Sequence, residues 1–363
     1  MSLKKISISN FRCFDNIELI FSDFNNFVYG SNGSGKTSIL EALYFCSTGR
    51  SFKSSNKDFC IQKNKNAFKI QLETLSNNKI CISKEFKKSI TFEIDENKVT
   101  SIELFRTIPS TLLDNKTFSM FADTPKYRRK IFDRCLIAAD KNYNKEFFSF
   151  HRSLKQRNAA LKFKRLTNID MWSQILIKAG ASVSKEREIF FEETKKTFFG
   201  FIKNFRDSRV VKIINSLEIV FNKGWSNDLS LKEALSASRD IDQIKTITTL
   251  GPHKADIKFL INDSDIKYIL SRGEQKFMAI LWCLSMHKTL SDFYGIKPFL
   301  IIDDIHSELD EGFYNELINF LPKTGNQLFF SDINNPFNSK IKDQLKELKK
   351  FHVEQFTNAK KTK

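Results

Sequence analysis

The sequence predicts an α/β fold in which both ends of the chain build one head domain and a helical lobe is inserted between them. Apolar residues alternate with polar ones near the N-terminus, a helical period dominates the middle, and strand patterns return towards the C-terminus. We therefore expect a discontinuous head formed by residues 1–115 and 245–363, and a helical lobe formed by residues 116–244.

The N-terminal part of the predicted head contains strands on both sides of one helix. Residues 6–9 and 17–21 alternate as strands do, and residues 27–29 form a short apolar run that ends at Gly30. From Thr37 the apolar residues fall on one helical face. Residues 67–105 alternate again, which predicts antiparallel strands.

A helical period extends from about Thr124 to Asn222. Within it we expect helices over residues 126–133, 143–163 and 171–205. Strand patterns return at residues 257–259 and 299–302, and the second run suits a parallel strand buried on both faces.

The net charge of the chain favours a polyanionic partner. Lys and Arg number 59 against 42 Asp and Glu, a formal net charge of +17. Lys and Arg that neutralise phosphates release condensed counterions, which drives binding to nucleic acid. A general bias of the sequence towards Lys, Asn, Ile and Phe is the alternative explanation.

The cysteines and the apolar runs argue against a cysteine metal site, a secreted protein and a membrane protein. The six cysteines are scattered without metal-site spacing, no secretory signal is present, and no apolar run is long enough to span a bilayer. We expect a soluble cytoplasmic protein with reduced thiols and no membrane partner.

The segment that follows the third predicted strand matches the phosphate-binding pattern G-x-x-x-x-G-K-[ST]. Its glycines let backbone N–H groups face phosphate oxygens, and the helix that begins near Lys36 adds the positive end of its dipole. The Lys36 ammonium would reach the β- and γ-phosphates of ATP, and the Thr37 hydroxyl would ligate Mg²⁺. The matching residues are Gly30, Ser31, Asn32, Gly33, Ser34, Gly35, Lys36 and Thr37.

Two acidic residues follow the apolar strand at residues 299–302, as in a Walker B motif. Parallel sheets bind ligands at the carboxyl ends of their strands. Asp303 would hold Mg²⁺, and Asp304 stands where most ABC-type ATPases carry a Glu that polarises the attacking water. Because Asp is one methylene shorter, we expect slow hydrolysis.

A third motif precedes the carboxylates and resembles the signature of ABC-type ATPases. Ser271 and Glu274 also form an ordinary S-x-x-E capping box, and the two interpretations are compatible because a capped helix start attracts anions. In that class, amides at this helix start bind the γ-phosphate held by a second subunit. The residues concerned are Ser271, Arg272, Gly273, Glu274 and Gln275.

The three motifs together predict that ATP drives formation of a homodimer. One copy would contribute Lys36 and Asp303, and the other Ser271 and Gly273. Residues 307–310 fit the D-loop of the same interface. His306 has either a structural or a catalytic role. Gln62 and Gln71 both remain candidates for the Q-loop glutamine.

The sequence resembles the RecF family, within the group that includes the SMC proteins, from Lys4 to about Asp332. Departures are Lys254, Ala255, Glu274 and Ser331, where the family favours Arg, Asp, Gln and Thr. Besides the three motifs, the resemblance rests on residues 10–12, 40–42, 50–52, 127–133, 153–159 and 249–253.

The resemblance implies an ABC-type ATPase head and an ATP-dependent DNA clamp with weak, DNA-dependent ATPase activity. Such proteins bind double-stranded DNA near single-stranded gaps. They act with RecR and RecO, and indirectly with RecA, in recombinational repair, replication and SOS induction. Arg12 and Ser38 would join the nucleotide site, and slow hydrolysis of ATP would reset the clamp.

Basic residues of the lobe are the candidates for contacts with DNA phosphates. Their alternative is an ordinary solvated helix face, and residues 155–157 are also candidates for a structural role within the lobe. Rival functions are an ABC transporter subunit, an SMC-like or nuclease-associated ATPase, and a DNA-binding module without enzymatic activity. The DNA candidates are Lys155, Arg157, Lys162, Lys164 and Arg165.

Overall fold

The computed structural model divides into two compact units. It describes residues 2–118, 120–121, 124–203, 205, 208–305, 309–332, 347–354 and 356. The first unit comprises residues 1–119 and 276–363, and the second comprises residues 120–275. The inserted segment therefore extends to residue 275, whereas the sequence pattern places its end at residue 244. Within the described residues, no helix has the length and apolar character needed to cross a bilayer.

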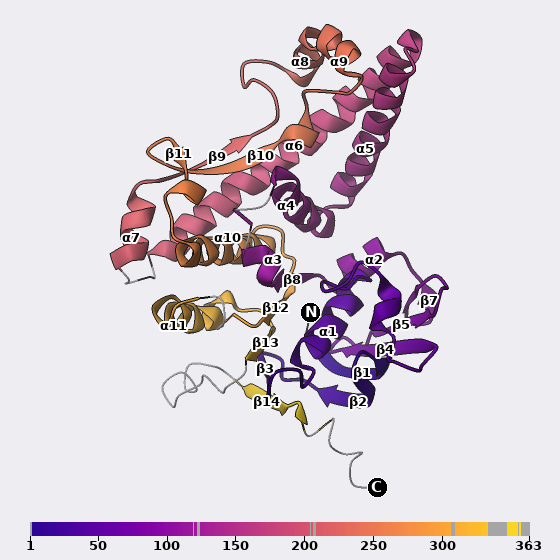
Figure 1. The fold of residues 1–363 in the computed structure, drawn as a ribbon, viewed down its shortest axis with the longest axis vertical. Coiled ribbons are helices and arrows are strands. Elements are labelled where there is room, and N and C mark those ends of the chain that lie inside the picture. The colour runs from indigo at the N-terminus through magenta and orange to yellow at the C-terminus, as the bar shows by residue number, and fades with distance from the viewer. Residues whose placement is uncertain are drawn as a thin grey trace. The chain divides into compact units, whose positions relative to one another are not determined.

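A five-stranded parallel sheet forms the centre of the first unit (Figure 1). Neighbouring strands of this sheet all run parallel, so their carboxyl ends meet at one edge of the sheet. The strand order is β14 (Leu348–His352), β3 (Asn25–Tyr29), β13 (Leu328–Asp332), β12 (Phe299–Asp303) and β8 (Ser110–Leu113).

A six-stranded antiparallel sheet forms the second layer of this unit. Its strand order is β2 (Phe14–Ile20), β1 (Leu3–Phe11), β4 (Ala67–Thr74), β5 (Lys79–Glu85), β6 (Thr91–Ile94) and β7 (Asn97–Lys98). The helices of the unit are α1 (Lys36–Thr48), α2 (Ser101–Thr107), α3 (Asn115–Phe118), α11 (Glu311–Phe320) and most of α10 (Arg272–Asp292). Short 3-10 turns are η1 (Lys57–Cys60) and η4 (Leu321–Thr324).

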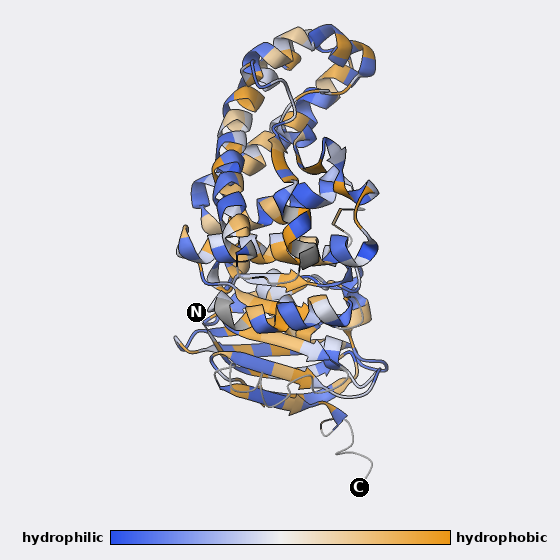
Figure 2. Cartoon of the chain, turned by 90° about the vertical axis from the view of Figure 1, so that its left-hand side faces the viewer, coloured by the Kyte–Doolittle hydropathy of each residue, from blue (hydrophilic) through white to orange (hydrophobic). Residues whose placement is uncertain are grey.

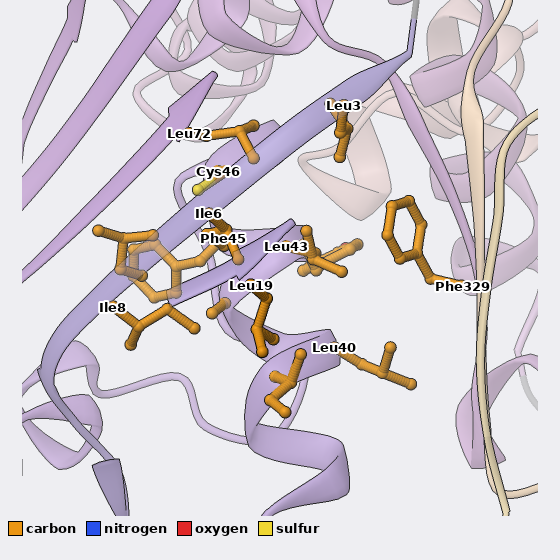
Figure 3. Packing of buried hydrophobic residues seen from close by; sticks show 14 of the residues in the cluster. Leu3, Ile6, Ile8, Leu19, Leu40, Leu43, Phe45, Cys46, Leu72 and Phe329 are labelled. Carbon is orange, nitrogen blue, oxygen red and sulfur yellow. The ribbon is translucent and has the colours of Figure 1, made fainter. Parts of the chain in front are cut away.

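Helix α1 contacts strands of both sheets, and its apolar residues build the core between them. Leu40, Leu43 and Phe45 are fully buried in a cluster with Ile6 of β1 and Phe329 of β13 (Figure 3). Burying one such side chain contributes about 1.5–3 kcal/mol. This packing fixes the start of α1, and with it the preceding loop, beside the central sheet.

The second unit contains a long helical hairpin and a small antiparallel sheet (Figure 1). Helices α5 (Lys141–Lys162) and α6 (Leu166–Ile202) pack along each other. Figure 2 shows that hydrophilic and hydrophobic residues alternate along the helices of the chain. The other helices are α4 (Pro125–Ala139), α7 (Ser208–Asn215), α8 (Leu231–Ala237) and α9 (Arg239–Lys245). The sheet has the order β11 (Ser264–Asp265), β10 (Asp256–Ile261) and β9 (Leu217–Asn222), with turns η2 (Pro252–Lys254) and η3 (Ile266–Tyr268).

Two local predictions were wrong. Residues 101–105 belong to helix α2, because Thr100 and Glu103 form a capping box that starts a helix there. Residues 217–222, expected within the helical region, form strand β9, which is held by a full antiparallel ladder with β10. In both places the hydrogen bonds made by neighbouring residues or by a paired strand decide the secondary structure, against the spacing of the apolar residues.

Candidate functional site

The glycine-rich loop connects the carboxyl end of β3 to the start of α1. Gly35, the residue before α1, has φ +112°, which favours glycine. A Cβ atom at Gly35 would also lie 2.7 Å from both the Cys13 sulfur and the Phe14 ring. A side chain at Gly35 would therefore force the loop, or the Cys13 and Phe14 side chains, to shift.

Lys36 bridges the loop from inside. Its ammonium donates to the carbonyl oxygens of Gly30 at 2.7 Å and Ser31 at 3.0 Å, and the residue is 8% exposed. The ammonium is thus held over the curled backbone, as a group that binds phosphate requires.

The two residues expected to bind Mg²⁺ lie together. The Thr37 hydroxyl donates to a carboxylate oxygen of Asp303 at 3.0 Å, although 266 residues separate them in the sequence. A hydroxyl and a carboxylate are oxygen ligands of the kind that Mg²⁺ prefers. The donor set therefore fits the predicted metal.

Ser331, at the end of β13, links both acidic residues. Its hydroxyl donates to the same oxygen of Asp303 at 2.9 Å and accepts from the backbone N–H of Asp304 at 3.2 Å. Asp304 has a positive φ of 52°, an uncommon conformation for a residue with a side chain. Burial raises the pKa of Asp303, and the hydrogen bonds from Ser331 and Thr37 oppose that rise.

Arg12 lines this site, and the buried carboxylate of Glu41 holds its side chain in place. Its guanidinium donates to both oxygens of Glu41, at 2.6 and 2.8 Å, and to the Phe59 carbonyl at 2.8 Å. Glu41 is fully buried, and Ser51 also donates to it. Such a bidentate pair fixes the guanidinium plane.

The first unit contains a cavity of about 590 Å³ at this site. Asp303 and Glu41 do not line it, but they bond to the lining residues Thr37 and Arg12. The sequence analysis did not predict six of the lining residues, because they belong to no phosphate-binding motif: Cys13, Lys53, Asp58, Phe59, Ile61 and Lys63. Gln62 lies between two lining residues, whereas Gln71 is exposed on β4 and does not line the cavity. The lining residues are Arg12, Cys13, Asn32, Gly33, Gly35, Lys36, Thr37, Ser38, Lys53, Asp58, Phe59, Ile61, Lys63, Asp304 and Ser331.

The signature-like segment begins α10, and its start is accessible. Ser271 and Arg272 are exposed, and the space around Gly273 is open. The Ser271 N–H donates to Glu274 at 2.8 Å, and the Ser271 hydroxyl accepts from the Glu274 N–H at 3.4 Å. Gln275 donates to the Leu270 carbonyl at 2.8 Å. The capping-box interpretation holds, and the helix start remains open to solvent.

The D-loop candidates are only partly described. His306, Ser307 and Glu308 lie outside the described residues. Asp310 starts α11 by accepting the Phe313 N–H at 3.0 Å.

Arg157 has to be removed from the predicted DNA contacts. It is 1% exposed and donates to Asp242 and Thr248, both at 2.7 Å, and to Ser173 at 2.8 Å. A buried charge with these partners cannot reach a phosphate. Arg157 therefore has the structural role in the lobe that the sequence also allowed for residues 155–157. The other candidates for DNA contacts are exposed: Lys155, Lys162, Lys164 and Arg165.

The other distinctive lobe residues form a second buried network. Arg187 donates to both oxygens of Asp133, at 2.7 and 2.9 Å, and to the Pro252 carbonyl at 2.7 Å. Tyr143 donates to Asp133 at 2.7 Å. The motifs at residues 127–133 and 249–253 therefore hold the lobe together internally.

Comparisons with known proteins agree with this geometry. The family model described as the RecF/RecN/SMC N terminal domain matches residues 2–355. The DNA replication and repair protein RecF of Pseudoalteromonas translucida is 31% identical, over 97% of this chain and 98% of that protein. This chain belongs to the RecF family. A second RecF relative, from Shewanella denitrificans, is 30% identical over 98% of each chain.

Solved structures extend the comparison to three dimensions. A structure described as the recombination mediator protein RecF with ATP, in the RecFOR pathway, has a TM-score of 0.79 and 26% identity, covering 97% of this chain and 96% of that one. An Smc head bound to a domain of ScpA has a TM-score of 0.57 at 12% identity and shows the fold alone. The prediction of an ATPase head of mixed α/β type with a helical insert is confirmed.

The Asp303 environment generates a testable pH dependence. A raised pKa means that the Asp303 proton is lost at a higher pH than usual, so divalent cation binding weakens as the pH falls through that pKa. Replacing Ser331→Ala removes a hydrogen bond to the ionised form, so cation binding should fail at a higher pH than in the wild type.

Titrating Mn²⁺ in the presence of ADP, from about pH 8 to about pH 5, measures this shift. Ser331→Thr retains a hydroxyl and serves as the control, with the wild-type pH profile expected. An unchanged profile in Ser331→Ala would contradict the assigned role of this hydroxyl.

Proposed function

We propose that this chain is an ATP-dependent DNA clamp of RecF type. The observation that carries the proposal is the hydrogen bond between Thr37 and Asp303, which joins the phosphate loop to the carboxylate strand beside the cavity that Thr37 and Asp304 line. A solved relative described as RecF with ATP supports the choice of nucleotide. In this proposal Gly30 to Ser38 bind the phosphates, and Thr37 and Asp303 hold Mg²⁺.

ATP would join two copies of the chain. The phosphate loop (P-loop) of one copy binds the triphosphate. The exposed start of α10 from the other copy, residues 271–275, binds the γ-phosphate of the same ATP. A helix N-terminus favours an anion there. Each ATP then contacts both copies, so the dimer forms with ATP and separates after hydrolysis.

Hydrolysis would be slow and would act as a timer. Asp304 is the group proposed to polarise the attacking water, and its backbone is held by Ser331. Its side chain is one methylene shorter than Glu, so it holds that water less closely. We infer a weak, DNA-dependent ATPase whose turnover releases the clamp.

The partner would be double-stranded DNA beside a single-stranded gap. Lys162 ends α5, Lys164 and Arg165 lie in the connection to α6, and Lys155 is exposed on α5. Figure 1 shows the two helices that this connection joins. Without a base-reading motif, binding would depend on salt and show little sequence preference. As a RecF-type protein, the clamp would act with RecR and RecO, and indirectly with RecA, in the cytoplasm during recombinational repair, replication and SOS induction.

The dimer proposal predicts distinct behaviour for two single variants. Wild type should be dimeric with ATP and monomeric with ADP or without nucleotide. Lys36→Met should not bind ATP, because it lacks the ammonium held over the loop. Ser271→Arg should bind ATP yet stay monomeric. Light scattering on sized samples, with nucleotide binding measured in parallel, checks these results.

A matched control is Ser264→Arg, which places the same side chain at an exposed serine of β11. It should dimerise as the wild type does. Normal dimerisation of Ser271→Arg with ATP would contradict the cross-subunit role of residues 271–275.

The DNA proposal predicts a change in salt dependence. Replacing Lys162, Lys164 and Arg165 together with Ala should make the plot of log K against log salt less steep by roughly 2 to 3, at about 0.9 per lost phosphate contact.

Arg157→Ala should instead lower the free energy of unfolding by about 3–5 kcal/mol, since it leaves buried Asp242 without its cationic partner.

Fluorescence anisotropy with gapped duplex DNA measures the slope, and urea denaturation measures the stability. Lys178→Ala with Lys196→Ala, two exposed positions of α6, is the control for lost charge. An unchanged slope in the triple variant would show that the α5–α6 connection does not contact DNA.

A further inference from the structure

A carboxylate from the C-terminal strand region contacts the phosphate loop. One oxygen of Glu354 accepts the backbone N–H of Ser31 at 2.9 Å and also accepts the Ser31 hydroxyl. These bonds join residues 323 apart in sequence. They lower the pKa of Glu354 below its ordinary value, with the hydroxyl contributing most, so the carboxylate stays ionised near neutral pH.

The central sheet places this carboxylate. Strand β14 pairs with β3 in parallel, with His352 opposite Tyr29, and the Val353 N–H extends the pairing to the Tyr29 carbonyl at 3.0 Å. The His352 ring stacks on Tyr29 at 4.9 Å between centroids. His352 also lies 2.9 Å from the second oxygen of Glu354. Both oxygens of the carboxylate therefore have partners, and its direction is fixed.

Ser31 is consequently held from two sides. Its carbonyl accepts from Lys36 at 3.0 Å, while its N–H and hydroxyl donate to Glu354. The first turn of the loop thus depends on a residue outside the G-x-x-x-x-G-K-[ST] motif. Hydrogen bonds to an ionised acceptor are shorter and stronger than neutral ones, although solvent screens this exposed contact. The contact therefore restrains the direction of the Ser31 peptide.

We propose that Glu354 is a positioning residue for nucleotide binding, which couples docking of the C-terminal strand region to occupation of the phosphate loop. The inference rests on the proposed function, because it requires that the loop binds ATP. Glu354 prearranges the Ser31 peptide, and with it the carbonyls that orient Lys36. Coupling of this kind is reciprocal, so ATP must in turn stabilise the docked strand.

Nucleotide binding tests the first half of the coupling. Glu354→Ala should bind ATP about 10-fold more weakly than the wild type, a typical size for coupling between sites. Glu354→Gln keeps an oxygen that accepts from Ser31 and should recover most of that affinity. Lys349→Ala, an exposed position on β14, controls for disturbance of the strand and should bind as the wild type does. Isothermal calorimetry measures all four proteins.

Hydrogen exchange tests the reverse effect of the coupling, in which ATP stabilises the docked C-terminal strand region. Amides of residues 348–354 should exchange more slowly with ATP in the wild type and in Glu354→Gln, and ATP should have no such effect in Glu354→Ala. A merely structural contact would change the exchange of the strand without making it depend on nucleotide.

The outcomes separate this inference from the proposed function. If Glu354→Ala binds ATP as tightly as the wild type, Glu354 does not position the loop. If it binds ATP more tightly, the carboxylate competes with phosphate, and the inference is overturned in sign. If the wild type itself behaves like Lys36→Met and binds no ATP, both the inference and the proposed function fail.

Discussion

The hydrogen bond between Thr37 and Asp303 is the contact on which the candidate site depends. It exists because β3, β13 and β12 are parallel neighbours, so that their carboxyl ends meet at one edge of the sheet. Ser331 is the next-to-last residue of the middle strand and bonds to Asp303 from there. The same edge receives Glu354 from beyond β14. One topological constraint therefore collects groups from four distant parts of the chain.

The second unit relies on a different kind of interaction. Buried Arg157 and Arg187 each bind a carboxylate and the loop at residues 248–252, so charged groups inside the lobe hold its helices and its loop together. Buried pairs of this type are costly to break from one side. Among the lobe residues that the structure describes, the exposed cations are a separate set, and these remain available to a polyanion.

Much of the site could be predicted because its motifs are local. The residues from Gly30 to Thr37 match a pattern that curls the backbone around a phosphate site, and an apolar run followed by Asp303 and Asp304 is typical of a buried strand that ends at a ligand-binding edge. Arg157 could not be placed in the same way, because an arginine on a polar helix looks alike whether it faces water or Asp242. Glu354 carries no local signal at all, since only the pairing of β14 with β3 brings it to Ser31.

The central claim is that each nucleotide site is divided between two copies of the chain, and mixing two inactive variants tests it most directly. Lys36→Met lacks a working P-loop, and Ser271→Arg lacks a working helix start, so neither should dimerise alone with ATP. Their mixture should regain ATP-dependent dimers in light scattering, because the P-loop of one variant meets the helix start of the other in one intact site. A mixture that stays monomeric with ATP would contradict the account.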